Sequence, residues 1–293
     1  MVVYKPLKGI GVYYLLAMLI FYDILIILGV FFVNSYVISS LLKLLFVIFT
    51  VYQLYYILFY SSIKYILDDE NVYISSFLRK IKISLKQIEC YKINSGNING
   101  VKLSGIITNS FAIGKSFIKK IGTTNIYVTS SKKILYLKSG DTNYALSPED
   151  YFAFEEFLNN KGIRNLDWEY RMKEEVHLYK DKYFMIPFII VSLIITTLTL
   201  NPFVLYLTRK LPDKMPLNFD SSFIPVDYGS GKQFAFNQMI YGVLNMAILF
   251  CMYYASHFYA KYDIKSAKKF IYISLVIALS FLLIQFRILY AFK

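Results

Sequence analysis

The sequence predicts an integral membrane protein of mixed α+β class, with about five transmembrane helices and an inserted cytosolic all-β domain capped by a C-terminal helix. The first observation is compositional: the mean hydropathy is +0.47 and only 17% of the residues are charged, which is unusual for a soluble protein. The second is that five apolar runs are each long enough to span a bilayer. The third is that these runs occupy only the two ends of the chain, so the middle forms a separate domain.

Each apolar run exceeds the roughly 20 residues that a helix needs to cross about 30 Å of hydrocarbon. The first run is too long for a signal peptide and is not followed by a small-residue cleavage pattern, so we interpret it as a retained helix. The runs divide the chain into a transmembrane hairpin, a β domain, a charged interfacial linker helix, and a three-span domain with an extracytoplasmic loop. The spans are 10–33, 36–60, 184–207, 234–257 and 270–292; the four parts are 1–62, 63–163, 164–183 and 184–293, with the loop at 208–233.

Lysine and arginine residues near the span ends predict the orientation of the chain in the membrane. With the N-terminus inside the cell, eleven of them lie on the cytoplasmic side and five on the opposite side. This count predicts a cytoplasmic N-terminus and β domain, and a C-terminus outside. It also accounts for much of the net charge of +13. Because the recognition motifs of nucleic-acid-binding proteins are missing, we expect membrane lipids and not nucleic acid as the anionic partner.

The segment between the second and third spans contains short runs of β-branched and aromatic residues separated by turn residues, a pattern typical of an antiparallel all-β domain. The clearest pair of strands is 125–129 followed by 133–138, and a turn at 139–141 leads into a further strand at 143–146. A domain of this size is expected to enclose a core of its own.

A single helix is predicted directly after these strands. Ser147 is the expected N-cap, Pro148 suits the first helical position, and Asp150 completes a spacing similar to a capping box. Phe154 lies on the apolar face of this helix, which ends at Gly162. We therefore expect Phe154 to be buried against the strands.

The end of the β domain resembles a bacterial pleckstrin-homology (PH) domain of the type found in bacterial membrane proteins. The resemblance rests on Ile121-Gly122, on the strand Tyr127-Val128-Thr129, and on Ser147-Pro148-Glu149-Asp150 followed by Phe154 and Phe157. It implies two roughly orthogonal sheets capped by a helix, used for binding partners or for assembly, in the inner membrane of a bacterium. Phosphoinositide binding is not implied.

Four basic residues form a cluster on the expected strands of this domain. Two interpretations are open: contact with anionic lipid headgroups, or a solvated strand face, which the sequence favours because no second basic loop obviously converges with the cluster. The residues are Arg79, Lys80, Lys82 and Lys86.

The loop between the third and fourth spans holds three of the seven prolines and is therefore expected to be ordered. It resembles a loop of a bacterial membrane domain of unknown function, which also occurs in immunity proteins against the sporulation-delaying toxin. That pattern runs Leu-Pro-acid-x-aliphatic-Pro-x-His-Phe, with a later Gly-x-x-Asp. Asn218 replaces the His, the one residue suited to metal binding or acid-base work, and Phe223 stands where Gly is usual. The candidate binding residues are Leu211, Pro212, Asp213, Met215, Pro216, Asn218, Phe219, Asp227 and Gly229.

Asp23 lies inside the first span, where an unpaired carboxylate is costly. Because only a few residues join the first two spans, Lys43 lies about three residues, or roughly 4.5 Å, from the level of Asp23, within reach of its flexible stem. An intramembrane ion pair between Asp23 and Lys43 is one interpretation, and Arg287 in the fifth span is the alternative partner. A protonated or locally hydrated Asp23 is a further alternative.

The sequence shows no nucleophile elbow, dinucleotide fingerprint or catalytic carboxylate pair, and neither His177 nor His257 has a metal ligand at a suitable spacing. We therefore expect no catalysis, no cofactor and no metal. The expected function is that of a sensor, adaptor or immunity-type regulator, which binds a protein or peptide partner through the β domain and the outer loop. The alternative is a transporter or transporter subunit, against which the lack of an internal repeat and of paired broken helices argues. Homo-oligomer formation stays open.

Overall fold

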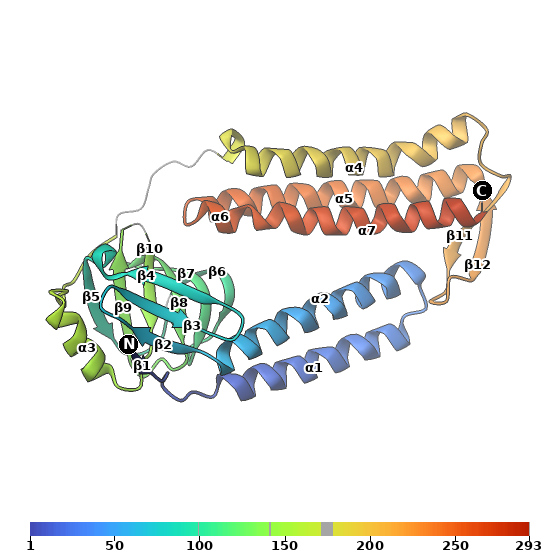
Figure 1. Cartoon of the computed structure of the whole chain (residues 1–293). Helices are drawn as coiled ribbons and strands as arrows, with labels where there is room; N and C mark the ends of the chain where they lie inside the picture. Colours follow the sequence, from blue (N-terminus) through green and yellow to red (C-terminus); the bar gives the residue numbers. More distant parts are fainter. Residues whose placement is uncertain (99, 141, 171–177, 293) are drawn as a thin grey trace. The chain divides into compact units, whose positions relative to one another are not determined.

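The computed structural model describes residues 1–98, 100–140, 142–170 and 178–292. Within these residues, five helical segments are long and apolar enough to cross a membrane, which confirms the predicted class (Figure 1). Their ends lie within a few residues of the predicted spans. The segments are α1 (Gly11–Phe32), α2 (Tyr36–Ser61), α4 (Lys182–Leu207), α5 (Gly231–Ala260), and α6 (Ile264–Ala267) followed by α7 (Lys269–Phe292).

The chain folds into two compact units, which we describe separately. The described residues of the first, the β unit, are 1–23, 48–98, 100–140 and 142–170. Those of the second, the helix unit, are 24–47 and 178–292. Helices α1 and α2 therefore each contribute residues to both units.

The smaller sheet of the β unit contains a strand from the N-terminus of the chain, which lies outside the predicted boundaries 63–163. This strand precedes the first span and pairs with the strand that follows the second span. The next residues stay with the domain, since Leu7 N donates to Ser147 O (2.8 Å) and Glu149 N donates to Lys5 O (2.9 Å). The antiparallel order is β1 (Val2–Tyr4), β2 (Lys64–Leu67), β3 (Asn71–Ser75) and β4 (Lys80–Ser84).

The larger sheet corrects the prediction that all strands are antiparallel. Strand β10 lies between β8 and β9 and runs parallel to β8. Strands β9 and β10 pair antiparallel. Thr129, directly after β8, donates its backbone N–H to the hydroxyl of Ser147, directly after β10 (2.9 Å). Asp141, in the predicted turn, lies outside the described residues. The sheet order is β5 (Cys90–Asn94), β9 (Ile134–Ser139), β10 (Thr142–Leu146), β8 (Gly122–Val128), β7 (Ala112–Ile118) and β6 (Gly100–Ile107).

Helix α3 (Tyr151–Asn160) closes the domain as predicted, but it begins later than expected. Its N-cap is Asp150, whose carboxylate accepts a hydrogen bond from Ala153 N (3.0 Å). Ser147 is not the cap, because its hydroxyl is buried between β8 and β10 and already accepts the hydrogen bond described above. Phe154 is fully buried, as its position on the apolar face predicts.

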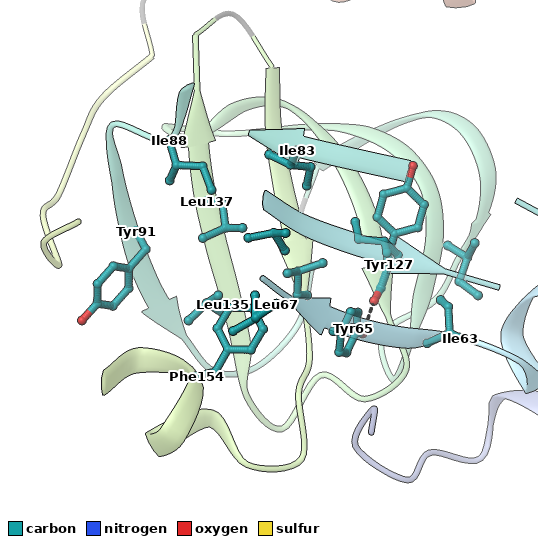
Figure 2. Close-up of a cluster of buried hydrophobic side chains, with 14 of the residues drawn as sticks. Ile63, Tyr65, Leu67, Ile83, Ile88, Tyr91, Tyr127, Leu135, Leu137 and Phe154 are labelled. Atoms are coloured by element: carbon teal, nitrogen blue, oxygen red, sulfur yellow. Dashed lines mark hydrogen bonds between the residues drawn. The ribbon is translucent and has the colours of Figure 1, made fainter. Parts of the chain in front are cut away.

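One hydrophobic cluster joins the strands, α3 and the ends of α1 and α2 (Figure 2). Tyr65, Leu137 and Phe154 are fully buried in it. The Tyr65 hydroxyl donates to Tyr127 O (2.6 Å), and burial raises the pKa of Tyr65 to about 12. Leu15 of α1 belongs to the same cluster. The core of the β domain therefore continues into the ends of the transmembrane hairpin.

The predicted linker helix is not helical in its first part. Residues 164–166 run beside β5, where Leu166 N donates to Tyr91 O (3.0 Å), and Tyr170 N donates to Lys120 O before β8 (2.8 Å). A helix in this segment would lose that pairing with the sheet. Residues 171–177 lie outside the described residues, and the 3-10 helix η2 (Leu178–Lys180) precedes α4.

In the helix unit, α4, α5 and α7 pack against one another. Pro202 lies inside α4 and has no N–H, so the carbonyl of Leu198, four residues earlier, loses its helical hydrogen bond. Gln285 of α7 supplies the missing donor, since its Nε2 lies 2.9 Å from Leu198 O. An unpaired carbonyl in hydrocarbon is costly, so this bond between helices stabilises the bundle.

Candidate binding surfaces

The loop between α4 and α5 is ordered, as its prolines predict, and it forms a β-hairpin. Strand β11 (Lys214–Phe219) pairs antiparallel with β12 (Pro225–Ser230). Asp220 fixes the turn, because its Oδ1 accepts hydrogen bonds from Ser222 N (2.9 Å) and Ile224 N (2.8 Å). The hairpin is therefore a defined surface and not a flexible tether.

Phe223 in this turn is the centre of an aromatic cluster that holds an arginine. Its φ of +67° is in the left-handed region that favours glycine. The Phe223 ring stacks on Phe219 (centroids 4.7 Å apart) and lies 4.7 Å from the Tyr36 ring. The guanidinium of Arg287 lies 4.3 Å from the centroid of Phe223 and donates to the Tyr36 hydroxyl. These four residues, named the Arg287 clasp, tie the hairpin to α2 and α7.

The structure separates the nine candidate residues of the loop into packed and exposed groups. Met215 and Phe219 pack against Phe234, Ile288 and Leu289, so they hold the hairpin on the helices. Across the two strands, the side-chain amide of Asn218 donates to Asp227 Oδ2 (3.1 Å). The buried group is Met215, Pro216 and Phe219; the half-buried group is Leu211, Pro212 and Gly229; the exposed group is Asp213, Asn218 and Asp227.

Three exposed apolar residues next to this set escape the sequence analysis. Ile224, Val226 and Tyr228 are 59%, 59% and 60% exposed. Val226 and Tyr228 lie on β12, which is an edge strand of a two-stranded sheet, and Ile224 directly precedes this strand. The period of two in Ile224-Pro225-Val226-Asp227-Tyr228 is the signal that would have identified them. These three residues are named the β12 row.

Three members of the predicted basic cluster lie together at the hairpin of β3 and β4. Arg79 ends the turn, and Lys80 and Lys82 are exposed on β4. The Nζ of Lys80 lies 4.3 Å from the centroid of the Tyr73 ring. Lys86 lies beyond the strand, in the short 3-10 helix η1 (Leu85–Gln87).

Asp23 accepts a hydrogen bond from a neutral donor, the hydroxyl of Thr50, which is not one of the predicted charged partners. The Thr50 hydroxyl lies 3.1 and 3.2 Å from the two carboxylate oxygens. The ion pair with Lys43 stays a prediction. In the helix unit, Lys43 lines an otherwise apolar cavity of about 330 Å³. The alternative partner, Arg287, is held in the clasp described above.

Comparison with known proteins identifies the β domain and the relatives of the whole chain. Residues 63–162 match the bacterial PH domain family. The whole chain is 39% identical over 286 residues to an uncharacterized protein of Clostridium acetobutylicum, and the match covers 97% of each chain. The chain belongs to the family of this clostridial protein. No solved structure matches the chain.

The PH domain is joined to the transmembrane hairpin by a buried tyrosine. The Tyr60 hydroxyl of α2 donates to Thr129 O of the PH domain (2.7 Å) and accepts from Gly11 N at the start of α1 (3.3 Å). Gly9 packs so closely that an added Cβ would lie 1.9 Å from Thr129 O. The Tyr60 ring also contacts Phe111 edge-on, with centroids 5.3 Å apart. The PH domain is therefore fixed to the ends of α1 and α2.

Neither the PH domain nor the rest of the described chain presents a metal centre. Among residues 1–98, 100–140, 142–170 and 178–292, no group of three His, Cys, Asp or Glu side chains is placed to hold a metal ion. His257 Nδ1 lies 3.0 Å from Tyr253 O, and His177 is outside the described residues. PH domains are non-catalytic interaction modules, so the comparisons support a non-enzymatic, membrane-associated protein.

Proposed function

We propose that this protein is a sensor, adaptor or immunity-type regulator of the bacterial inner membrane, with the PH domain in the cytoplasm and the β11–β12 hairpin outside. In this proposal the hairpin binds an extended segment of a protein or peptide partner. The observation that carries it is the β12 row, three exposed apolar side chains on a hairpin that the Arg287 clasp holds in place.

The chemistry of the β12 row suits an extended partner. Burial of one such side chain contributes about 1.5–3 kcal/mol, and the free edge of β12 supplies backbone groups that pair with an added strand. Because the clasp already orders the hairpin, little conformational entropy is lost on binding. The resemblance of the loop to that of immunity proteins supports a peptide partner.

The first test is photo-crosslinking of the full chain in native membranes. A benzophenone amino acid at Tyr228 is expected to form one defined adduct, and the substitution Val226→Asp is expected to abolish it, because a charge in the row opposes burial. The readout is the intensity of the adduct on a denaturing gel. The matched control carries the same amino acid at Tyr262, which lies outside the hairpin between α5 and α6.

The outcome that contradicts the proposal is equally specific. No adduct at Tyr228, or an adduct whose yield does not change with Val226→Asp, removes the β12 row as the binding surface. An equal adduct at Tyr262 shows that the captured protein is a general neighbour in the membrane. Protein abundance in each variant separates loss of binding from loss of folding.

A transporter or transporter subunit is the second candidate, because polar residues inside a membrane bundle often mark a substrate path. Gln238, Asn245 and Gln285 are buried in the helix unit. The geometry favours a structural role for Gln285, since its Nε2 satisfies the carbonyl that Pro202 leaves unpaired. Solute uptake by the purified protein in liposomes would reverse this ranking.

A further inference from the structure

The turn between β3 and β4 exposes a large apolar side chain at the tip of the PH domain. Phe77 is 84% exposed and Leu78 is 42% exposed. A solvated turn is normally built from polar residues, and here Ser76 is the only polar residue before the basic run begins at Arg79. Residues 76–80 are named the β3–β4 tip. They combine two exposed apolar side chains, Phe77 and Leu78, with the basic residues that follow them.

A hydrogen bond places this tip at the end of a transmembrane span. Phe77 N donates to the Ser62 hydroxyl (2.9 Å), and Ser62 directly follows the last residue of α2. Helix α2 has 26 residues, or about 39 Å at roughly 1.5 Å per residue, which exceeds the hydrocarbon thickness of about 30 Å. A helix of this length extends beyond the hydrocarbon, and Tyr55, Tyr56 and Tyr60 in its last turns are of the residue type that is enriched among lipid headgroups.

Charges on this sheet are divided between its two ends. The turn between β2 and β3 consists of Asp68, Asp69 and Glu70. Because the strands are consecutive and antiparallel, that acidic turn and the β3–β4 tip lie at opposite ends of the hairpin. The basic end is the one next to α2, and the acidic end faces away, where Asp69 pairs with Lys161 (3.0 Å). This polarity complements an anionic membrane surface.

We propose that the β3–β4 tip is a site at which the PH domain contacts the membrane. Phe77 and Leu78 enter the interfacial layer of the leaflet in which α2 ends, and Arg79, Lys80 and Lys82 contact anionic lipid headgroups beside them. The lipid surface is the occupant, since the bond to Ser62 fixes the tip at headgroup depth. The tip and the Tyr60 junction then hold the PH domain in one orientation on the membrane.

The test is quenching of tryptophan fluorescence by brominated lipid chains, with the full chain in nanodiscs. The native Trp168 is replaced by Phe in every variant, and a single new tryptophan is introduced by Phe77→Trp. The matched control is Leu166→Trp, since Leu166 is exposed and bonds to Tyr91. Figure 2 shows Tyr91 at the opposite end of the core from Ile63, which follows α2.

Strong quenching of Trp at position 77 by brominated phosphatidylcholine, with little quenching at position 166, is expected. Replacing part of the phosphatidylcholine by phosphatidylglycerol should increase the quenching at 77, and Lys80→Gln with Lys82→Gln should remove that increase. Equal quenching at both positions, or none at 77, overturns the proposal.

A second measurement covers the case in which Trp168→Phe unfolds the domain. A spin label at Phe77→Cys, in a Cys251→Ala background, reports its depth by power saturation with oxygen and with a water-soluble nickel complex. Higher accessibility to oxygen supports insertion of the tip. Higher accessibility to nickel, equal to that of a label at Leu166→Cys, overturns it.

Discussion

The substitution Phe154→Asp is expected to unfold the PH domain. Phe154 is fully buried on α3, and its ring lies 5.2 Å from that of Tyr4 in β1. Loss of a buried phenylalanine costs about 3–5 kcal/mol, and the new carboxylate adds the cost of a buried, unpaired charge. Together these two costs amount to a large part of the roughly 5–15 kcal/mol that stabilises a typical domain. The measurement is the yield of monodisperse protein by size-exclusion chromatography after solubilisation.

The chain offers a control for this substitution on the same helix. Phe152 is 67% exposed, so Phe152→Asp changes the same residue type without burying a charge. Its yield and thermal midpoint should stay close to those of the unaltered protein. A Phe154→Asp variant with the same yield as Phe152→Asp would show that α3 does not close the core.

The substitution Gly9→Ala is expected to disrupt the junction between the PH domain and the transmembrane hairpin. An added Cβ would meet Thr129 O at 1.9 Å and the Tyr60 hydroxyl at 2.6 Å, and the first of these atoms belongs to the backbone. Overpacking of this kind costs about 1–3 kcal/mol. It should also break the hydrogen bond from the Tyr60 hydroxyl to Thr129 O. The measurement is the thermal midpoint of the full chain in detergent.

Gly29 in α1 is the matched control for Gly9. A Cβ there would lie 3.5 Å from Leu42 Cδ1, which is an ordinary van der Waals contact. Because alanine also favours the helix over glycine by about 1 kcal/mol, Gly29→Ala should leave the midpoint unchanged or raise it. A midpoint that falls equally in both variants would refute the account of the Tyr60 junction.

The spans were predictable because lipid imposes a constraint that is local in sequence. Each run of about 20 apolar residues specifies a helix whatever its neighbours do. The burial of Phe154 was predictable for a similar reason, since helical periodicity places it on the apolar face without knowledge of the partner strands.

Pairing between distant segments was not predictable in this way. The N-terminal strand has only three residues, Val2–Tyr4, and its partner β2 follows the second span. The position of β10 beside β8 likewise depends on a contact that no local pattern encodes. Ser147 carries a good capping signal, but tertiary structure uses its hydroxyl for Thr129 N instead.

The candidate surfaces show the same division between local and distant information. The prolines of the loop predict order, and the alternation in β12 would have revealed the exposed row. The Arg287 clasp could not be predicted from the sequence, because it joins Tyr36, Phe223 and Arg287 from three separate parts of the chain. Sequence reasoning therefore placed Arg287 only as the alternative partner of Asp23.

In the proposed function the PH domain and the hairpin face opposite sides of the membrane, and thiol labelling tests this topology most directly. Asp69→Cys in the PH domain and Ser222→Cys in the hairpin are both exposed positions, and Cys251→Ala removes the native exposed cysteine. With an impermeant reagent on intact cells, we expect labelling at 222 only, and at both positions after permeabilisation. Labelling at 69 in intact cells would contradict the account, since it would place the PH domain outside the cell.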